Sequence, residues 1–288
     1  MLKKVFIAIA LFLLSIPVCS FAQDLDGGPY TPGKDADIDM FIGDWHNSMP
    51  KHTHGLLIER DILTKGDPMN PATPGAVLKY VNRFTYAFLD ADAVTTPTTL
   101  KGEQEIFYIL SGKGTIAAGG KTENLVTGST VLMPAGLEFT MKAASGEPLT
   151  MYLINEPIPQ GFRPNKDMII KNENSMPVSS NKGHWVHIVK TLFETSDGLG
   201  TLERVLTVSF DPMTIGHPHS HDAGVEEVWT AVTGESLAFI GKQIRLQKPG
   251  MGYMIPPDGK TPHSNINTGS EQIKMFYFAR YTDHEVRK

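Results

Sequence analysis

One segment in the second half of the chain carries several side chains able to bind a transition metal. The string Gly216-His-Pro-His219-Ser-His221 is followed shortly by Glu226-Glu227. Side chains on an extended strand alternate between two faces, so His219 and His221 point the same way, and Glu227 shares their face if the intervening turn preserves the register. Further along, His263 could complete the set. Three imidazoles and one carboxylate suit Mn, Fe, Co, Ni, Cu or Zn and leave coordination positions open.

Neighbouring residues offer alternatives for parts of this site. Glu226 is the alternative carboxylate and the nearest acidic group that could serve catalysis, although parity places it on the opposite face from Glu227. His217 shares the face of the histidines, but Pro218 stiffens that turn, so we expect His217 beside the ligands or at the surface. By parity with Glu227, Trp229 faces the interior and shapes the pocket.

The elements that must position these residues occur twice along the chain. A constant offset of 122 residues (227 − 105 = 122) relates these pairs: Phe88 and Phe210, Glu105 and Glu227, Gly112 and Gly234, Gly128 and Gly250, Pro134 and Pro256. Further upstream the offset is 130, which indicates an eight-residue insertion near Met69 to Ala76 in the first copy (130 − 122 = 8). Two related domains follow, over residues 23–160 and 161–288, with a proline-rich join near residues 156–174.

Within each copy the apolar runs are short and separated by Gly, Pro, Asn or Asp. They include Glu105 to Leu110, Thr130 to Met133, Leu149 to Ile154, Val205 to Phe210, and Met275 to Ala279. These lengths and the β-branched and aromatic content favour strands over helices. The sequence therefore predicts an all-β protein of two barrels or sandwiches in tandem.

The paired motifs resemble the cupin superfamily, and the duplication resembles the bicupins. The first motif appears as His219, His221, Glu227 and Gly234, and the second as Gly250, Pro257, Gly259, His263 and Asn267. The gaps from His221 to Glu227 and from Gly259 to His263 are each one residue longer than is usual in this family. If Glu226 were the carboxylate ligand, the first gap would have its usual length. The similarity covers roughly Leu78 to Ala279.

This resemblance implies tandem double-stranded β-helix barrels of jelly-roll type. It further implies that His219, His221, Glu227 and His263 hold one divalent transition metal (Mn, Fe, Ni, Cu or Zn) in the C-terminal barrel. A small-molecule substrate and a homodimer are also family expectations.

The first copy keeps the scaffold but not the ligands. Under the same offset His219 falls on Pro97 and His221 on Thr99, while Phe139 or Thr140 stands where the third histidine is expected. Glu105 is the one ligand position that survives, so we expect a degenerate, metal-free barrel.

Other histidines carry weaker signals. His52, His54, Glu59 and Gly66 formally satisfy the first motif, but no second motif follows, so we expect a surface or lid segment. Should it fold over the metal barrel, His52 or His54 could line the substrate. His184 and His187 are expected to be polar residues at a strand edge.

The resemblance also frames the function. Bicupins with this ligand set are similar to flavonol-type dioxygenases, oxalate decarboxylases and oxidases, and ureidoglycine-type aminohydrolases. We expect a metal-dependent enzyme, an oxidoreductase of dioxygenase or decarboxylase type, acting on a small oxygen-rich organic acid, sugar acid or phenol, with Glu227 and Glu226 as candidate catalytic carboxylates. The alternatives are a non-catalytic sugar- or acid-binding cupin, or a metal-dependent aminohydrolase, lyase or isomerase.

The amino-acid composition argues against two further classes of protein. Lys and Arg number 26 against 31 Asp and Glu, a formal charge of −5, which argues against nucleic acid as a partner. The single Cys of the 288 residues excludes a disulfide framework.

The N-terminal residues predict export. Lys3 and Lys4 precede an apolar run from Val5 to Val18, and Ser20-Phe-Ala22 offers the small residues of a cleavage site. We expect residues 1–22 to be a signal peptide and the mature protein to be periplasmic or secreted, without a membrane anchor. Cys19 raises a lipoprotein alternative, for which the preceding Pro17 and Val18 are poor residues.

Overall fold

The computed structural model describes residues 28–179 and 184–281. The expected signal peptide and Cys19 lie outside these residues. Within them, no helix is long and apolar enough to cross a membrane. The helical elements described are short 3-10 turns, namely η1 (Ile38–Phe41), η2 (Trp45–Asn47), η3 (Glu173–Ser175) and η4 (Thr195–Asp197).

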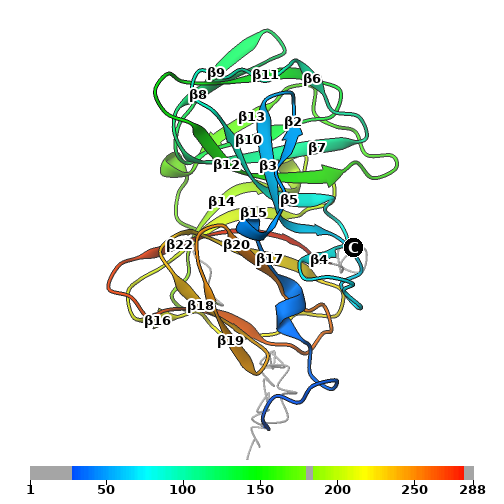
Figure 1. Cartoon of the computed structure of the whole chain (residues 1–288), viewed down its shortest axis with the longest axis vertical. Helices are drawn as coiled ribbons and strands as arrows, with labels where there is room; N and C mark the ends of the chain where they lie inside the picture. The colour runs from blue at the N-terminus through cyan, green and yellow to red at the C-terminus, as the bar shows by residue number, and fades with distance from the viewer. Residues whose placement is uncertain (1–27, 180–183, 282–288) are drawn as a thin grey trace, which may run out of the picture.

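The first copy forms a barrel from a large and a small sheet, drawn in blue, cyan and green in Figure 1, whose strands pair antiparallel except β3 and β4. The large sheet runs β13 (Ile169–Asn172), β10 (Ser129–Met133), β7 (Glu103–Ser111), β12 (Leu149–Pro157), β5 (Arg83–Leu89), β3 (Leu57–Lys65) and β2 (Lys51–Thr53), with β4 (Ala76–Leu78) beside β3. The small sheet runs β6 (Thr98–Thr99), β11 (Glu138–Ala143), β8 (Gly114–Ala118) and β9 (Lys121–Leu125).

The second copy repeats this plan in the yellow to red part of Figure 1. Its large sheet runs β1 (Ile42–Asp44), β20 (Met251–Met254), β17 (Glu226–Thr233), β22 (Ile273–Arg280), β15 (Arg204–Phe210) and β14 (Ile188–Glu194). Its small sheet runs β16 (Thr214–Ile215), β21 (His263–Asn267), β18 (Ser236–Ile240) and β19 (Gln243–Gln247). The predicted all-β tandem barrels, and every strand predicted from an apolar run, are confirmed.

Each large sheet has, at one edge, a strand from the other half of the sequence. Strand β1 lies early in the chain but pairs with β20 of the second barrel, while β13 lies beyond the proline-rich join and pairs with β10 of the first barrel. Backbone hydrogen bonds between strands therefore connect the two halves of the chain.

Alternation along the strands divides the apolar side chains into three clusters. One fills the first barrel and includes Phe107 and Leu153, and another fills the second and includes Trp229 and Tyr277. The third lies between the barrels, where Tyr108 stacks on Phe276 with ring centroids 4.9 Å apart. Consecutive residues on one strand therefore face either a barrel interior or the junction between the barrels.

Candidate metal centre

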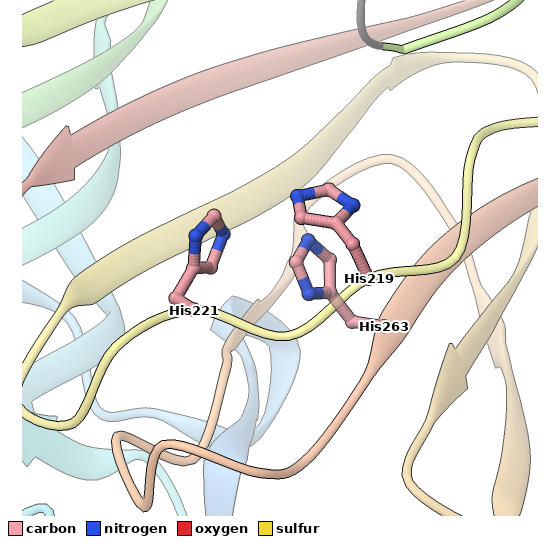
Figure 2. Close-up of side chains that lie close together, drawn as sticks. All are labelled: His219, His221 and His263. Atoms are coloured by element: carbon pink, nitrogen blue, oxygen red, sulfur yellow. The ribbon is translucent and has the colours of Figure 1, made fainter. Parts of the chain in front are cut away.

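The loop before β17 and the start of β21 bring three histidines together in the second barrel. The ligand nitrogens of His219, His221 and His263 all lie within 4.8 Å of one another. Figure 2 shows the three imidazoles converging, with His219 and His221 on one loop and His263 on a separate segment. Sequence reasoning selected these three residues, and the structure places them side by side.

Local hydrogen bonds explain why these distant segments meet. The backbones of His219 and His263 form a bridge, in which His263 N donates to His219 O at 2.9 Å. The carboxylate of Asp258 accepts from the backbone N–H of Thr261 at 2.8 Å and closes the turn before His263. The two motifs are thus joined through their backbones.

Glu227 lies against two of the histidines. Its Oε2 is 2.8 Å from His221 Nε2, and its Oε1 is 2.9 Å from His263 Nε2. Neither nitrogen has a partner with hydrogen-bond geometry among the described residues. Adjacent ligand atoms about 2.1 Å from a shared ion would lie roughly 3 Å apart, so this spacing fits a metal between them.

Neighbouring side chains orient the ligands. Trp229 Nε1 donates to Glu227 Oε1 at 2.7 Å, and the Tyr277 hydroxyl donates to Glu227 Oε2 at 2.8 Å. The Nδ1 of His219 lies 2.8 Å from the carbonyl oxygen of His217, an arrangement in which Nδ1–H donates and Nε2 is left as the ligand atom. His217 therefore acts through its backbone, beside the ligands.

Burial and the charges of neighbouring groups together set the protonation of these residues. Burial lowers the pKa of His263 to about 4, and burial together with neighbouring His184 lowers the pKa of His187 to about 3. Burial also acts to raise the pKa of Glu227, but the charges of His221 and His263 hold it well below its usual value. Burial acts to lower the pKa of His221, and the Glu227 carboxylate raises it overall. An ionised carboxylate and largely neutral imidazoles are the forms that bind metal.

A cavity of about 50 Å³ opens beside the ligands. Its lining includes His219 and Glu227, and also His184, His187, Arg204 and Tyr281. His184 and His187 lie just before β14, the edge strand of the large sheet, and their rings stack 5.3 Å apart against the site. The spacing of these two histidines in the sequence matches no ligand motif, so the sequence could not predict that they line the cavity.

Glu226 does not join this group. Its side chain leaves β17 on the opposite face, and its Oε2 accepts the backbone N–H groups of Lys79 and Tyr80 at 2.6 and 3.1 Å. The catalytic role expected of Glu226 therefore has no geometric support, because one step along a strand turns the side chain to the other face.

In the first barrel, Glu105 has ligand-type neighbours that the sequence comparison did not supply. His54 Nε2 lies 3.0 Å from Glu105 Oε2, and Glu59 belongs to the same group of close ligand-type atoms. The segment expected on the surface or as a lid thus enters the first barrel, although His52 stays exposed, and neither residue reaches the cavity of the second barrel.

Arg83 fills the centre of this cluster. Its guanidinium donates to Glu59 Oε2 and Glu105 Oε1, both at 2.9 Å, and Asn155 also donates to Glu105. Burial acts to raise the pKa of Glu59, yet the charge of Arg83 lowers it overall. In the first barrel a side-chain cation balances the carboxylates.

Comparison with known proteins agrees with this architecture. Residues 89–155 match the family model of the cupin domain. No curated protein matches the chain. Among solved structures, similar folds include Ylba from E. coli (TM-score 0.63, 15% identity, covering 83% of this chain and 90% of that one) and a mutant of Bacillus subtilis oxalate decarboxylase OxdC (0.63, 10%, 85% and 78%). Vicilin from Corylus avellana, the hazelnut, is also similar (0.62, 11%, 84% and 85%).

Residues 89–155 are thus a cupin domain, and the whole chain has a fold of two β-barrels in tandem that is similar to these structures. At these identities the similar structures establish the fold alone.

Proposed function

We propose that this chain is an exported bicupin that binds one divalent transition metal through His219, His221, Glu227 and His263. We further propose that it acts there as a metal-dependent oxidoreductase on a small oxygen-rich organic acid. The observation that carries the proposal is the convergence of imidazole nitrogens without hydrogen-bond partners on the Glu227 carboxylate.

The surroundings of the ligands support an enzyme over a closed structural site. A bound metal would supply Lewis-acid or redox chemistry at substrate oxygens. The adjoining cavity leaves space beside His219 and Glu227 for water or a small ligand. Arg204 at the edge of this cavity lies over the ring of Tyr281 at 5.8 Å and offers a positive charge to a carboxylate substrate.

A chain of hydroxyl groups gives the site a route for protons. The Tyr277 hydroxyl lies between Glu227 and the Tyr281 hydroxyl, which in turn lines the cavity. A proton could move along this chain without displacing either ring.

Elemental analysis tests the proposed metal site. We expect about one transition metal per mature chain, lost in the double variant H219A/H221A and kept in the control H46A/H52A, whose histidines are exposed. Two metals per chain would show that the His54 cluster binds metal as well. No metal, even after reconstitution, would contradict the proposal.

Two further measurements test the remaining parts. Water exchanging on the metal, seen by proton relaxation of the manganese-loaded protein, is expected for an enzyme, whereas a closed site would favour a binding protein.

N-terminal sequencing of the exported protein is expected to begin at Gln23; retention of residues 1–22 would contradict export by this signal.

A further inference from the structure

A second cavity lies at the junction of the two barrels, apart from the metal centre. Its volume is about 280 Å³. Its walls are largely apolar and come from both halves of the chain: Pro68, Met69 and Tyr80 from the first, and Val225, Met254 and Pro257 from the second. A cavity of this size and character suits a small organic molecule.

Glu226 is one of the charged residues that line this cavity, together with Asp67 and Lys79. The residue is 2% exposed, and its Oε2 is occupied by the backbone N–H groups of Lys79 and Tyr80. Its Oε1 is buried and has no hydrogen-bond partner among the described residues. A buried carboxylate oxygen without a donor costs free energy, so a donor supplied by a ligand would be stabilising.

The other half of the molecule provides an internal comparison. There Glu156 accepts backbone N–H groups from the matching loop, those of Gly200, Thr201 and Leu202, much as Glu226 accepts those of Lys79 and Tyr80. Both oxygens of Glu156 are occupied by this loop, Oε1 by Gly200 and Oε2 by Thr201 and Leu202, and Gln104 also donates to Oε1. The unfilled oxygen of Glu226 is therefore not a consequence of this loop-binding role.

The chain after β3 forms one wall of the cavity. This wall consists of Gly66, Asp67, Pro68 and Met69, and Met69 is the first residue of the insertion expected in the first copy. Asp67 Oδ1 accepts the backbone N–H of Met69 at 3.0 Å and fixes this wall. Met69 is 67% exposed and stands at the opening.

The geometry points to a second ligand site in this cavity, for a small, largely apolar molecule that presents one N–H or O–H donor to Glu226 Oε1. The guanidinium of Arg280, which lies 4.4 Å from the Tyr80 ring centre, already places positive charge near the carboxylate. A neutral donor therefore suffices, and the apolar walls would hold the rest of the molecule.

Indole tests this site, because it is apolar and donates one N–H without offering a strong acceptor. We expect indole to shift the methyl signals of Met69 and Met254 in the protein labelled at its methionine methyl groups, and to leave Met141 of the first barrel unmoved. N-methylindole, which lacks the donor, should bind at least tenfold more weakly. Equal binding of the two probes, or no shift at Met69 and Met254, would overturn the proposal.

Variants assign the donor interaction to Glu226. In E226Q an amide oxygen can still accept the two backbone N–H groups, while an amide N–H₂ replaces Oε1, so indole affinity should fall at least tenfold. The control E235Q alters an exposed glutamate of the same barrel and should bind as the wild type does. If E226Q fails to fold, M69A removes one exposed wall side chain and should weaken indole binding severalfold; unchanged binding in either folded variant would contradict the site.

Two further binding measurements identify the class of ligand and distinguish this site from the candidate metal centre. Phenol binding more tightly than indole would identify hydroxyl compounds, and the reverse would identify N–H heterocycles; binding of neither would reject the proposal. The H219A/H221A variant should bind indole normally, since its substitutions lie on the other side of β17. Failure of the metal proposal and failure of this one are therefore distinguishable.

Discussion

The side chains around Glu227 show how single residues prepare the candidate metal centre. Glu227 accepts from Trp229 and Tyr277 while it faces two histidines, so its two oxygens are held in place from behind. Partners of this kind fix the orientation of a ligand and raise its affinity for metal. The Tyr277 hydroxyl is the more easily removed of the two, because a phenylalanine ring would fill the same space.

We expect Y277F to lower metal affinity about 10- to 100-fold with little change in fold. The measurement is a metal titration against a competing chelator, with circular dichroism as the check on folding. Y86F, which alters a tyrosine of the first barrel, is the matched control. Wild-type affinity in Y277F would mean that Glu227 is held adequately by Trp229 alone.

His54 allows a prediction on pH. Burial acts to lower the pKa of His54, but the charge of Glu105 raises it above its ordinary value of 6.5. A histidine whose pKa is raised on folding stabilises the protein fully below the unfolded pKa, and this contribution is lost as pH rises through the folded pKa. We use H54N for the test, because His54 has a positive φ of 46° that Asn tolerates.

The free energy of unfolding of H54N should fall short of the wild type by on the order of 1–3 kcal/mol near pH 6, and by less at pH 9. Chemical denaturation at several pH values measures the difference, and H52N, an exposed neighbour, should show none. A deficit that stays constant with pH would reject the charged contact with Glu105.

Among the strands, β1 and β13 connect the two halves of the chain, because each pairs with the barrel formed mainly by the other half. Strand β1 passes so close to the first barrel that a Cβ on Gly43 would lie 1.7 Å from the carbonyl oxygen of Ile62. The approach is between backbones, so no side-chain rotation can relieve it. The position requires glycine for close packing and not for an unusual φ.

G43A should therefore destabilise the protein by about 1–3 kcal/mol or more, as overpacking of a rigid site does. G269A is the control, because its new Cβ would meet Asn267 at an ordinary 3.4 Å in an exposed turn. Thermal unfolding of both variants measures the effect. Equal stability of the two would show that β1 is not held as tightly as the structure indicates.

The apolar cluster at the junction joins the barrels into one molecule. Phe276 of the second barrel contacts Tyr108, Phe84 and Tyr152 of the first, with the Tyr152 ring centre 5.8 Å away. Burial of these rings removes a large apolar surface from water. Neither barrel would keep its outer sheet face covered without the other.

We expect the wild type to unfold in a single transition and F276A to lose about 3–5 kcal/mol while remaining cooperative. Calorimetry compared with tryptophan fluorescence tests this, because two separate transitions would show that the barrels are independent. A fall in the stability of the second barrel alone would likewise contradict a shared core.

The sequence alone determined the class of fold and much of the candidate metal centre. Short apolar runs encode strands locally, a duplicated pattern exposes two copies, and period-two alternation separates Glu227 from Glu226. His219, His221 and His263 were predictable because their spacing within a repeated motif carries the signal.

The tertiary structure alone decided what surrounds these sites. His184, His187 and Arg204 reach the metal cavity, and Arg83 and His54 reach Glu105, through contacts between segments far apart in sequence. The same holds for the exchange of β1 and β13 and for the cavity beneath Glu226. Such contacts depend on how sheets twist and pack against each other, and no local pattern of residues encodes that.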